Sequence, residues 1–415
     1  MVVFSHSTIR PKHLRMKIPA LNQDNLQGPP LVWPEPRRSI VNLLSSLALG
    51  LGGRATGHPP LESISPEWIH SHRQVVLLVI DGLGTSQLRA HVPGGLLHSA
   101  LRDEVTSVFP STTASAVTTL MTGLSPREHG LVGWHMYFRE LGAVLAVLPG
   151  RPRYGGSDWQ QSGVDVSGLL GLSPFTARIQ MPSTILSPAN ISASKFNRAI
   201  RGPAEVLPFS SRDDFFEILA SRCLKTRGRA YHYAYWSEFD HLAHEEGAFS
   251  LKARAHLQDF ERRLERFLKK IRGSETLLII TADHGFMDHD PAEIIILEHY
   301  PEIASHLLLP LTGEARAAYA FVRSGHNERF EQDVQDLLSD RVSMFRSEDL
   351  IAAGVFGDGA QHERLCDRVG DYTLIPRGRG ILRDRLFGEK TSRMVGVHGG
   401  VSADEMWVPV IPLSA

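Results

Sequence analysis

The sequence predicts an α/β protein: a three-layer sandwich around a mostly parallel central sheet. Three apolar runs have the composition of strands buried on both faces. Helical stretches separate these runs along the chain. An aspartate follows each run, and in two of the three a histidine lies close to it. Strands that alternate with helices favour parallel pairing, because each crossover helix returns the chain to the same edge of the sheet.

The predicted strands differ in composition but share this ending. Val75 to Ile80 is a continuous apolar, β-branched run that stops at the turn signal Asp81-Gly82. Residues 230–236 are rich in aromatic side chains and lead into SEFDHLAH. Residues 276–281 (TLLIIT) lead into an Asp-His-Gly triplet.

Capping signals locate the helices. Ser211 is the expected N-cap of RDDFFEILASRCLK, which has acids in its first turn and bases in its last. Ser250 caps a longer amphipathic helix, for which Gly273 is the expected C-cap. A further helix is predicted from Ser39 to Leu51.

The pattern weakens in three parts of the chain. Residues 1–70 are rich in proline and polar residues and are predicted to be an N-terminal extension packed on the core. The remainder, 71–415, is the predicted core. Within it, the segments 138–210 and 290–390 fit the strand–helix alternation poorly and are predicted to be insertions, or cap segments, on that core.

Composition excludes several classes of protein. With 44 basic and 45 acidic residues, the chain is neither a basic nucleic-acid binder nor an acidic disordered chain. Two cysteines exclude a disulfide scaffold and a cysteine-based zinc site. The start of the chain lacks an apolar signal region, and the uncharged stretch 39–53 is too short and polar to span a membrane. We therefore expect a cytoplasmic protein without a membrane or nucleic-acid partner.

Metal-binding residue types gather where the strands end. Asp81 follows the first strand, Asp240 and His244 follow the second, and Asp283 and His284 follow the third. His398, in VGVHGG, is a further candidate. Ligands in open α/β sheets bind beyond the carboxyl ends of strands, and Asp and His donors suit Zn²⁺ or Mn²⁺. Each residue alone has a plainer explanation, such as a turn aspartate or an i,i+4 surface pair.

A nucleophile candidate lies in the hydroxyl-rich segment VTSVFPSTTASAVTTLMTG. Thr112 or Thr113 opens a predicted helix that runs through Met121 and is closed by Thr122-Gly123. A hydroxyl at this position faces unsatisfied N–H groups and the positive end of the helix dipole, which together favour a phosphate. An ordinary threonine N-cap is the commoner reason for such a residue.

Together these motifs resemble the alkaline phosphatase superfamily, specifically its nucleotide pyrophosphatase/phosphodiesterase-like (type I phosphodiesterase) branch. There the nucleophile lies nine residues before the threonine of a Thr-Gly pair, and nine residues before Thr122 is Thr113. The stretch TGLSPREHG, the Asp-x-x-x-His step, the Asp-His-Gly triplet and the closing His-Gly match in the same order.

The resemblance implies an alkaline-phosphatase-like fold and two divalent metal ions, Zn²⁺ as first choice and Mn²⁺ as second. One site would use Asp240, His244 and His398. The other would use Asp81, Thr113, Asp283 and His284. The implied reaction is hydrolysis of a small phosphate ester or nucleotide through a phospho-threonine at Thr113. A phosphomonoesterase, a phosphonate hydrolase and a non-catalytic metal- or nucleotide-binding protein remain as alternatives.

The sequence departs from the branch at one substrate-binding position. The branch has an asparagine 21 residues after the nucleophile, where this chain has Trp134. An indole N–H donates one hydrogen bond and replaces an amide only in part. The sulfatase pattern is absent around Thr113. His129 is expected to be structural, and the resemblance gives no ligand role to His241 or to residues 288–290.

Overall fold

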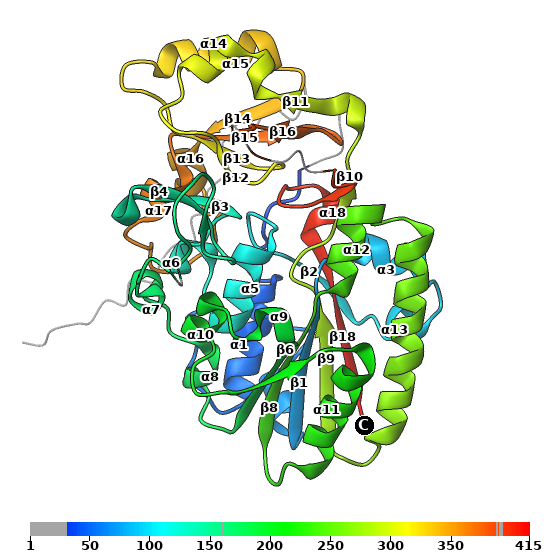
Figure 1. The fold of residues 1–415 in the computed structure, drawn as a ribbon. Coiled ribbons are helices and arrows are strands. Elements are labelled where there is room, and N and C mark those ends of the chain that lie inside the picture. The colour runs from blue at the N-terminus through cyan, green and yellow to red at the C-terminus, as the bar shows by residue number, and fades with distance from the viewer. Residues whose placement is uncertain (1–30, 160, 387–388, 390–392) are drawn as a thin grey trace, which may run out of the picture.

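The computed structural model describes residues 31–159, 161–386, 389 and 393–415. Figure 1 shows an α/β core below a second, smaller sheet, with the start of α5 and the carboxyl ends of the core strands between them. The arrangement confirms the predicted fold class of helices packed around a mostly parallel central sheet.

The central sheet has seven strands. Five neighbouring strands pair in parallel, and the C-terminal strand is antiparallel to both of its neighbours. In spatial order the strands are β2 (Asp103–Thr106), β18 (Trp407–Ser414), β9 (Thr276–Thr281), β1 (Gln74–Ile80), β8 (Ala230–Trp236), β6 (Ser183–Pro188) and β7 (Glu205–Phe209).

The three strands predicted from apolar runs lie side by side in the middle of this sheet. Every residue of β1, β8 and β9 is buried, as the unbroken apolar composition indicates. Ile80 is opposite Trp236, and Val79 is opposite Thr281, so the three strands end at the same level. The residues that follow them are therefore delivered to one edge of the sheet.

Two groups of mutually contacting helices flank the sheet (Figure 1). One group consists of α1 (Ile40–Gly50), α5 (Thr113–Thr122), α8 (Phe175–Arg178) and α10 (Lys195–Ile200). The other consists of α3 (Thr85–His91), α11 (Arg212–Lys225), α12 (Glu238–Glu246) and α13 (Leu251–Lys270).

The remaining helices connect these elements and the second sheet. They are α2 (Pro66–His70), α4 (Leu96–Ser99), α6 (Pro126–His129), α7 (Val166–Leu170), α9 (Ala189–Ser192), α14 (Pro301–Ser305), α15 (Asn327–Leu338), α16 (Ser347–Ala352), α17 (Leu365–Val369) and α18 (Ala403–Met406), with 3₁₀ turns η2 (Arg139–Leu141), η3 (Pro291–Glu293) and η4 (Leu297–His299).

The helix caps follow the sequence closely. The Ser211 and Ser250 side chains each accept a hydrogen bond from a first-turn backbone N–H. Helix α13 nevertheless stops at Lys270, with Ile271 at the C-cap, earlier than the predicted Gly273. Ile271 is fully buried, and Gly273 instead takes a positive φ of 78° in the turn toward β9.

The segment 138–210, predicted to be an insertion, also supplies β6 and β7 to the central sheet. Strand β7 lies at the sheet edge, and only its last residue, Phe209, is buried. An edge strand needs no continuous apolar run, so periodicity alone does not reveal it.

The second sheet also has seven strands, and its pairs are antiparallel. Their order is β14 (Val342–Arg346), β15 (Tyr372–Pro376), β13 (Ala318–Ala320), β12 (Thr312–Gly313), β3 (His135–Phe138), β4 (Ala143–Ala146) and β5 (Arg151–Pro152). Two short pairs join β10 (Met287–Asp288) to β17 (Gly396–Val397) and β11 (Ile294–Ile296) to β16 (Ile381–Arg383).

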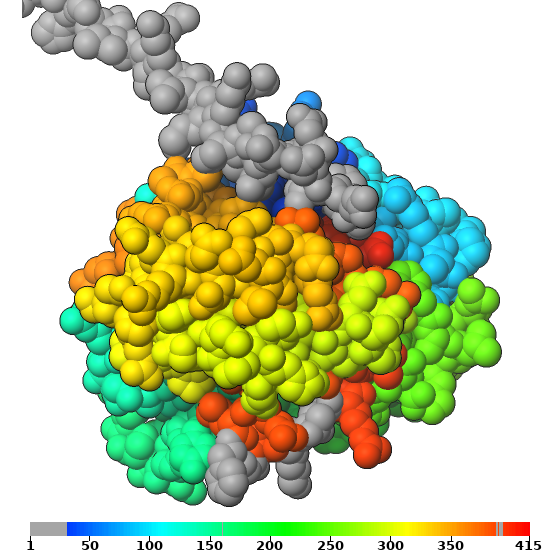
Figure 2. Space-filling view, turned by 90° about the horizontal axis from the view of Figure 1, so that it is seen from above, coloured from blue at the N-terminus to red at the C-terminus, as the bar shows by residue number. Residues whose placement is uncertain are grey.

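A separate apolar cluster lies between α15 and this second sheet. It includes Phe330 and Val334 of α15 together with Tyr372 and Leu374 of β15. Figure 2 shows the yellow segments that include α14 and α15 in the middle of the face seen from above. The second sheet therefore has its own packed core above the α/β core.

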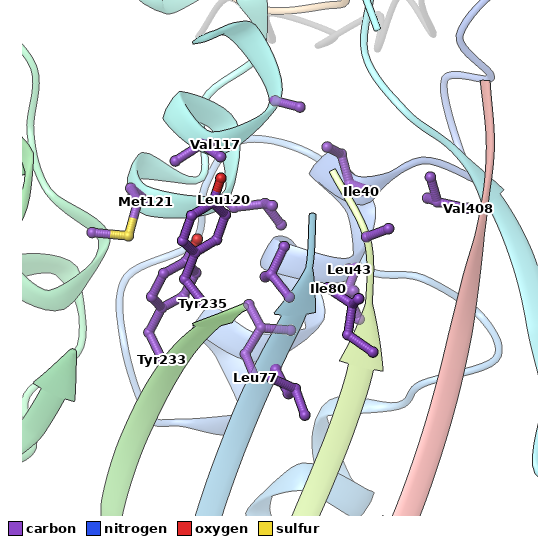
Figure 3. Packing of buried hydrophobic residues seen from close by; sticks show 14 of the residues in the cluster. Ile40, Leu43, Leu77, Ile80, Val117, Leu120, Met121, Tyr233, Tyr235 and Val408 are labelled. Atoms are coloured by element: carbon purple, nitrogen blue, oxygen red, sulfur yellow. The ribbon is translucent and has the colours of Figure 1, made fainter. Parts of the chain in front are cut away.

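Helix α1 packs the N-terminal part of the described chain against the central sheet. Ile40, Leu43, Leu44 and Leu47 are fully buried. Figure 3 shows Ile40 and Leu43 near Leu77 and Ile80 of β1, with Val117 and Leu120 of α5 close by. The prediction for residues 1–30 lies outside the described residues. Within the described part of the chain, no helix is both long and apolar enough to cross a bilayer.

Candidate active site

The residues predicted as metal ligands come together at the carboxyl edge of β1, β8 and β9. Two groups form there: Asp81 with Asp283 and His284, and Asp240 with His244 and His398. Asp240 and His244 lie one turn apart on α12, which follows β8 directly. The His284 and His398 rings stack with centroids 3.7 Å apart, so the two groups adjoin.

Within each group the imidazole Nε2 atoms face carboxylate oxygens. His284 Nε2 is 3.5 Å from both Asp81 Oδ1 and Asp283 Oδ2. His244 Nε2 is 3.5 Å, and His398 Nε2 3.8 Å, from Asp240 Oδ1.

The opposite nitrogen of each ring is held by the backbone. His244 Nδ1 donates to Gly396 O at 2.9 Å, His284 Nδ1 to Gly285 O at 3.0 Å, and His398 Nδ1 to Ser111 O at 3.3 Å. A carbonyl only accepts, so Nδ1 carries the proton and, in a neutral ring, Nε2 presents a lone pair. Metal-binding histidines are oriented in this way.

Each of the three carboxylates has one buried oxygen without a partner among the described residues. Asp283 Oδ1 accepts from the N–H groups of Gly82 and His284, each at 3.0 Å, and Tyr235 donates to Asp81 Oδ2. The remaining oxygens, Asp81 Oδ1, Asp240 Oδ1 and Asp283 Oδ2, have no hydrogen-bond partner among the described residues. Buried carboxylate oxygens left in this state carry a desolvation cost that a cation would offset.

Burial and like charges favour the neutral forms of these side chains, which raises the pKa of the carboxyl groups and lowers that of the imidazole. Burial, then the charges of Asp240 and Asp283, hold the pKa of Asp81 well above its usual range. Burial also raises the pKa of Asp240. It places the pKa of His398 well below its usual range, with His284 and His244 adding to the effect. His398 is therefore a neutral imidazole with a lone pair to donate.

Thr113 is the first residue of α5 and lies against this cluster. Its hydroxyl donates to His284 Nε2 at 3.1 Å, since His284 Nδ1 carries the ring proton. Thr112 is the N-cap, and Gly123 ends the helix with a φ of 74° in the left-handed region. Thr113, which the family resemblance selects over Thr112, is the threonine whose hydroxyl contacts the cluster, while the Thr112 hydroxyl contacts Glu314.

Glu314 is a site residue that sequence reasoning missed. Its Oε1 accepts from the Thr112 hydroxyl at 2.6 Å and from the Trp134 backbone N–H at 2.7 Å. Burial raises the pKa of Glu314 to about 7, against the lowering effect of these two hydrogen bonds. No sequence signal marks it, because it lies in a short turn of the second sheet.

Replacing Glu314 with glutamine is expected to stabilise the protein at pH 8 but not at pH 5. The folded protein raises the pKa of Glu314 from 4.5 to about 7. Protonation of Glu314 therefore contributes fully to the stability of the folded protein below about pH 4.5. This contribution is lost as the pH rises through about 7. The loss amounts to at most about 3 kcal/mol, and glutamine does not ionise.

Thermal unfolding in the presence of EDTA, from pH 5 to pH 8, measures this difference. A gap between the Glu314→Gln variant and wild type that stays constant across the range would contradict the raised pKa.

The loop that carries His398 is anchored by a buried ion pair. Glu405 is fully buried and accepts from Arg316 Nη2 at 3.1 Å and from Gly400 N–H at 2.8 Å. Arg316 follows β12 and also donates to Pro376 O. The second sheet therefore fixes the backbone next to His398.

Tyr235 is the second residue that the sequence reasoning missed. It lies on β8, and its hydroxyl donates to Asp81 Oδ2. The register pairs it with Val79 on β1, two residues before Asp81. The aromatic composition of the strand predicts only that Tyr235 is a core residue. Its hydrogen bond to Asp81 depends on which strand lies beside β8, and the sequence does not show that.

Trp134 lies at the site through its backbone. Its N–H bonds Glu314, while its side chain is 37% exposed. His129 is buried within α6 and contacts Thr119 and the Leu131 N–H, consistent with a structural role. Asp288 accepts from the Ala248 N–H and Asp290 caps η3, which gives both of these carboxylates structural partners.

Solved structures with the same fold include murine ectonucleotide pyrophosphatase/phosphodiesterase 5, at TM-score 0.59 and 18% identity over 81% of this chain and 87% of that one. An inactive variant of that protein, in complex with AMP, matches equally. The human counterpart gives a TM-score of 0.61 at 18% identity, with coverage of 81% and 87%. Phosphonoacetate hydrolase from Sinorhizobium meliloti, in complex with phosphonoformate, gives 0.58 at 17% identity, with 82% and 90% covered.

No curated protein matches the chain in sequence. The sequence profile of the family described as type I phosphodiesterase/nucleotide pyrophosphatase, however, matches residues 75–400, which include every residue of both Asp/His groups. The chain belongs to that family and is a metal-dependent phosphoester hydrolase.

Proposed function

We propose that the protein hydrolyses small phosphate esters with two divalent metal ions, and that Thr113 is the nucleophile. The observation that carries the proposal is the pair of adjoining Asp/His groups with the Thr113 hydroxyl against one of them. The preferred substrate class is a phosphodiester or nucleotide pyrophosphate.

The donor atoms fit a pair of cations. Three unpartnered carboxylate oxygens and three imidazole Nε2 atoms converge there, and their lone pairs face one another. Asp81, Asp283, His284 and Thr113 would hold one ion, and Asp240, His244 and His398 the other. Aspartate and histidine donors suit Zn²⁺, and Mn²⁺ as a second choice. Bound there, the ions would supply the positive charge that activates a hydroxyl and stabilises phosphoryl oxygens.

We assign Thr113 the attack on phosphorus, because its hydroxyl lies against the Asp/His groups. Its oxygen forms a bond to the phosphorus atom while the bond from phosphorus to the leaving oxygen breaks, and the hydroxyl proton ends on that leaving oxygen, which gives a phospho-threonine and a free alcohol. Water then cleaves this ester and regenerates the hydroxyl. The first-turn N–H groups of α5 would donate to phosphoryl oxygens at this helix end and stabilise their charge in the transition state.

The nucleotide preference is supported by relatives of the same fold. The murine structure with AMP indicates a nucleoside monophosphate group as one product to test. Trp134 remains a proposed substrate contact: its half-exposed indole offers a stacking face and one N–H donor.

A panel of metals and substrates tests the proposal. The metal-free protein is reloaded with Zn²⁺, Mn²⁺ or Mg²⁺ and assayed with bis(p-nitrophenyl) phosphate, the p-nitrophenyl ester of a nucleoside monophosphate, p-nitrophenyl phosphate and phosphonoacetate. We expect turnover of the diesters at the highest kcat/KM and two bound ions per chain. Faster turnover of the monoester or the phosphonate would favour the alternatives on the same metal core. Fewer than two bound ions and no turnover would favour a non-catalytic protein.

Replacing Tyr235 with phenylalanine is expected to weaken metal binding by about 10- to 100-fold, the usual cost of losing an outer hydrogen bond to a ligand. The change removes the only donor that Asp81 Oδ2 has from a side chain among the described residues. Isothermal titration of the metal-free protein with Zn²⁺ measures the effect.

Tyr233→Phe is the matched control. Tyr233 lies on the same strand, is equally buried, and its hydroxyl has no hydrogen-bond partner among the described residues. Its loss should leave Zn²⁺ affinity unchanged. Equal effects from the two variants would show that Tyr235 acts through packing and not through Asp81.

A further inference from the structure

Thr112 is the N-cap residue of α5, but its side chain does not cap the helix. Thr112 has the extended backbone of an N-cap, yet its hydroxyl makes no hydrogen bond to the helix. A threonine at this position ordinarily accepts from the N–H of the second or third helical residue, which here are Ala114 and Ser115. Instead, the hydroxyl donates to Glu314 Oε1 at 2.6 Å.

Glu314, which accepts the hydrogen bond from Thr112, is held in position by its neighbours. It follows Gly313 of β12 and also accepts from the Trp134 N–H. Gly399, next to His398, has a φ of +108°, and a Cβ there would lie 2.6 Å from Glu314 Cγ. The carboxylate is therefore packed between the start of α5, the loop before β3 and the loop after β17.

Two other buried side chains, Asp283 and His284, lie at the same end of α5. Asp283 is fully buried, and its unpartnered Oδ2 is 3.5 Å from His284 Nε2, which accepts from Thr113, the first residue of the helix. Asp283 and His284 therefore indicate a charged ligand at this helix end, and neither side chain forms a hydrogen bond to Glu314 in the described part of the chain.

We propose that Glu314 is a positioning residue: by binding the Thr112 hydroxyl, it keeps the first-turn N–H groups of α5 open for a phosphoryl oxygen. This inference rests on the proposed function, which takes that helix end as the phosphate subsite. Without the carboxylate, the Thr112 side chain turns to cap its own helix and competes with the substrate for the same N–H groups.

Removing Glu314 and then removing the competing hydroxyl tests this directly. In metal-loaded Glu314→Ala we expect affinity for inorganic phosphate to fall, and KM for bis(p-nitrophenyl) phosphate to rise, by about 10-fold, the value of one charge-assisted hydrogen bond. Adding Thr112→Val should recover most of that loss, because valine cannot cap the helix. Glu314→Gln keeps an acceptor oxygen for Thr112 and should bind phosphate more tightly than Glu314→Ala.

The comparison separates positioning from packing. The Trp134 N–H loses its partner equally in Glu314→Ala and in the double variant, so the recovery isolates the Thr112 hydroxyl. If Glu314→Ala does not fold, Glu314→Met fills the same space without a strong acceptor, and the pair Glu314→Met and Glu314→Met/Thr112→Val replaces it. Phosphate binding is measured by titration calorimetry.

A double variant that binds phosphate no better than its parent would overturn the proposal, as would undiminished binding in Glu314→Ala. If wild type binds no phosphate, the helix end is not a phosphate subsite and the inference fails. Wild-type protein that binds phosphate but turns over no ester contradicts the proposed function alone, and the order of phosphate affinities still decides the role of Glu314.

Discussion

Thr113→Ala is expected to abolish turnover of phosphate diesters, with kcat reduced on the order of 10⁴-fold or more, as when a covalent nucleophile is removed. The Thr113 hydroxyl is the one on α5 that contacts the Asp/His groups among the described residues. Alanine preserves the helix, since it has the highest intrinsic helix propensity. The rate of p-nitrophenol release at saturating Zn²⁺ or Mn²⁺ measures the loss.

Thr113→Ser is the matched variant, because it restores the hydroxyl and removes only a methyl group. It should retain measurable turnover and accumulate a phospho-serine in place of the phospho-threonine, which mass spectrometry of acid-quenched enzyme detects. Thr113→Ala protein that keeps a near-wild-type rate at saturating metal would exclude Thr113 as the nucleophile.

Asp283→Asn is expected to abolish metal-dependent activity while making the metal-free protein more stable. In the metal-free fold Asp283 lies buried close to Asp81, whose pKa is raised by burial, then by the charges of Asp240 and Asp283. An asparagine still accepts from the Gly82 and His284 N–H groups through one oxygen. Its amide adds a donor where an oxygen was left without a partner.

We expect the midpoint of thermal unfolding of metal-free Asp283→Asn to lie roughly 1 °C above that of metal-free wild type, for a gain of about 1 kcal/mol. Wild type should regain stability with added Zn²⁺, by about 2.7 kcal/mol per site at 100 times the dissociation constant. The variant should gain less and lose about 10²-fold or more in kcat/KM. Differential scanning calorimetry with and without Zn²⁺, together with diester assays, checks both parts.

Asp290→Asn is the control for Asp283→Asn. Asp290 belongs to the acidic stretch just after the Asp-His-Gly triplet, but its side chain caps η3. Its replacement should change neither Zn²⁺ stabilisation nor activity. Metal-induced stabilisation that survives in Asp283→Asn would contradict the assignment of Asp283 as a ligand.

The elements with strong local signals could be predicted from sequence. The strands at 230–236 and 276–281 and the helix capped by Ser211 have the predicted bounds, because burial on both faces and capping hydroxyls leave direct marks in composition. The Asp and His residues at the strand ends also meet as expected, since parallel strands in register end at a common edge.

Other parts had no local signal. Strands β6 and β7 come from a segment that resembled an insertion. Strand β7 lies at the sheet edge, where a strand does not need a continuous apolar run. Tyr235 and Glu314 reach the site only through partners 154 and 202 residues away in the chain. Such contacts depend on which strand lies beside which, and no spacing along the sequence encodes that.

The sequence by itself therefore determined the α/β class, the family and the residue types that gather at the strand ends. Hydrophobic periodicity and short motifs depend on residues that are close together in the chain, so the sequence alone shows them. The family resemblance selects Thr113 over Thr112 by its spacing to Thr122, but only the tertiary structure shows what each hydroxyl contacts, since both lie at the start of the same helix. One donates to His284 and the other to Glu314 because α5 starts between the core sheet and the second sheet.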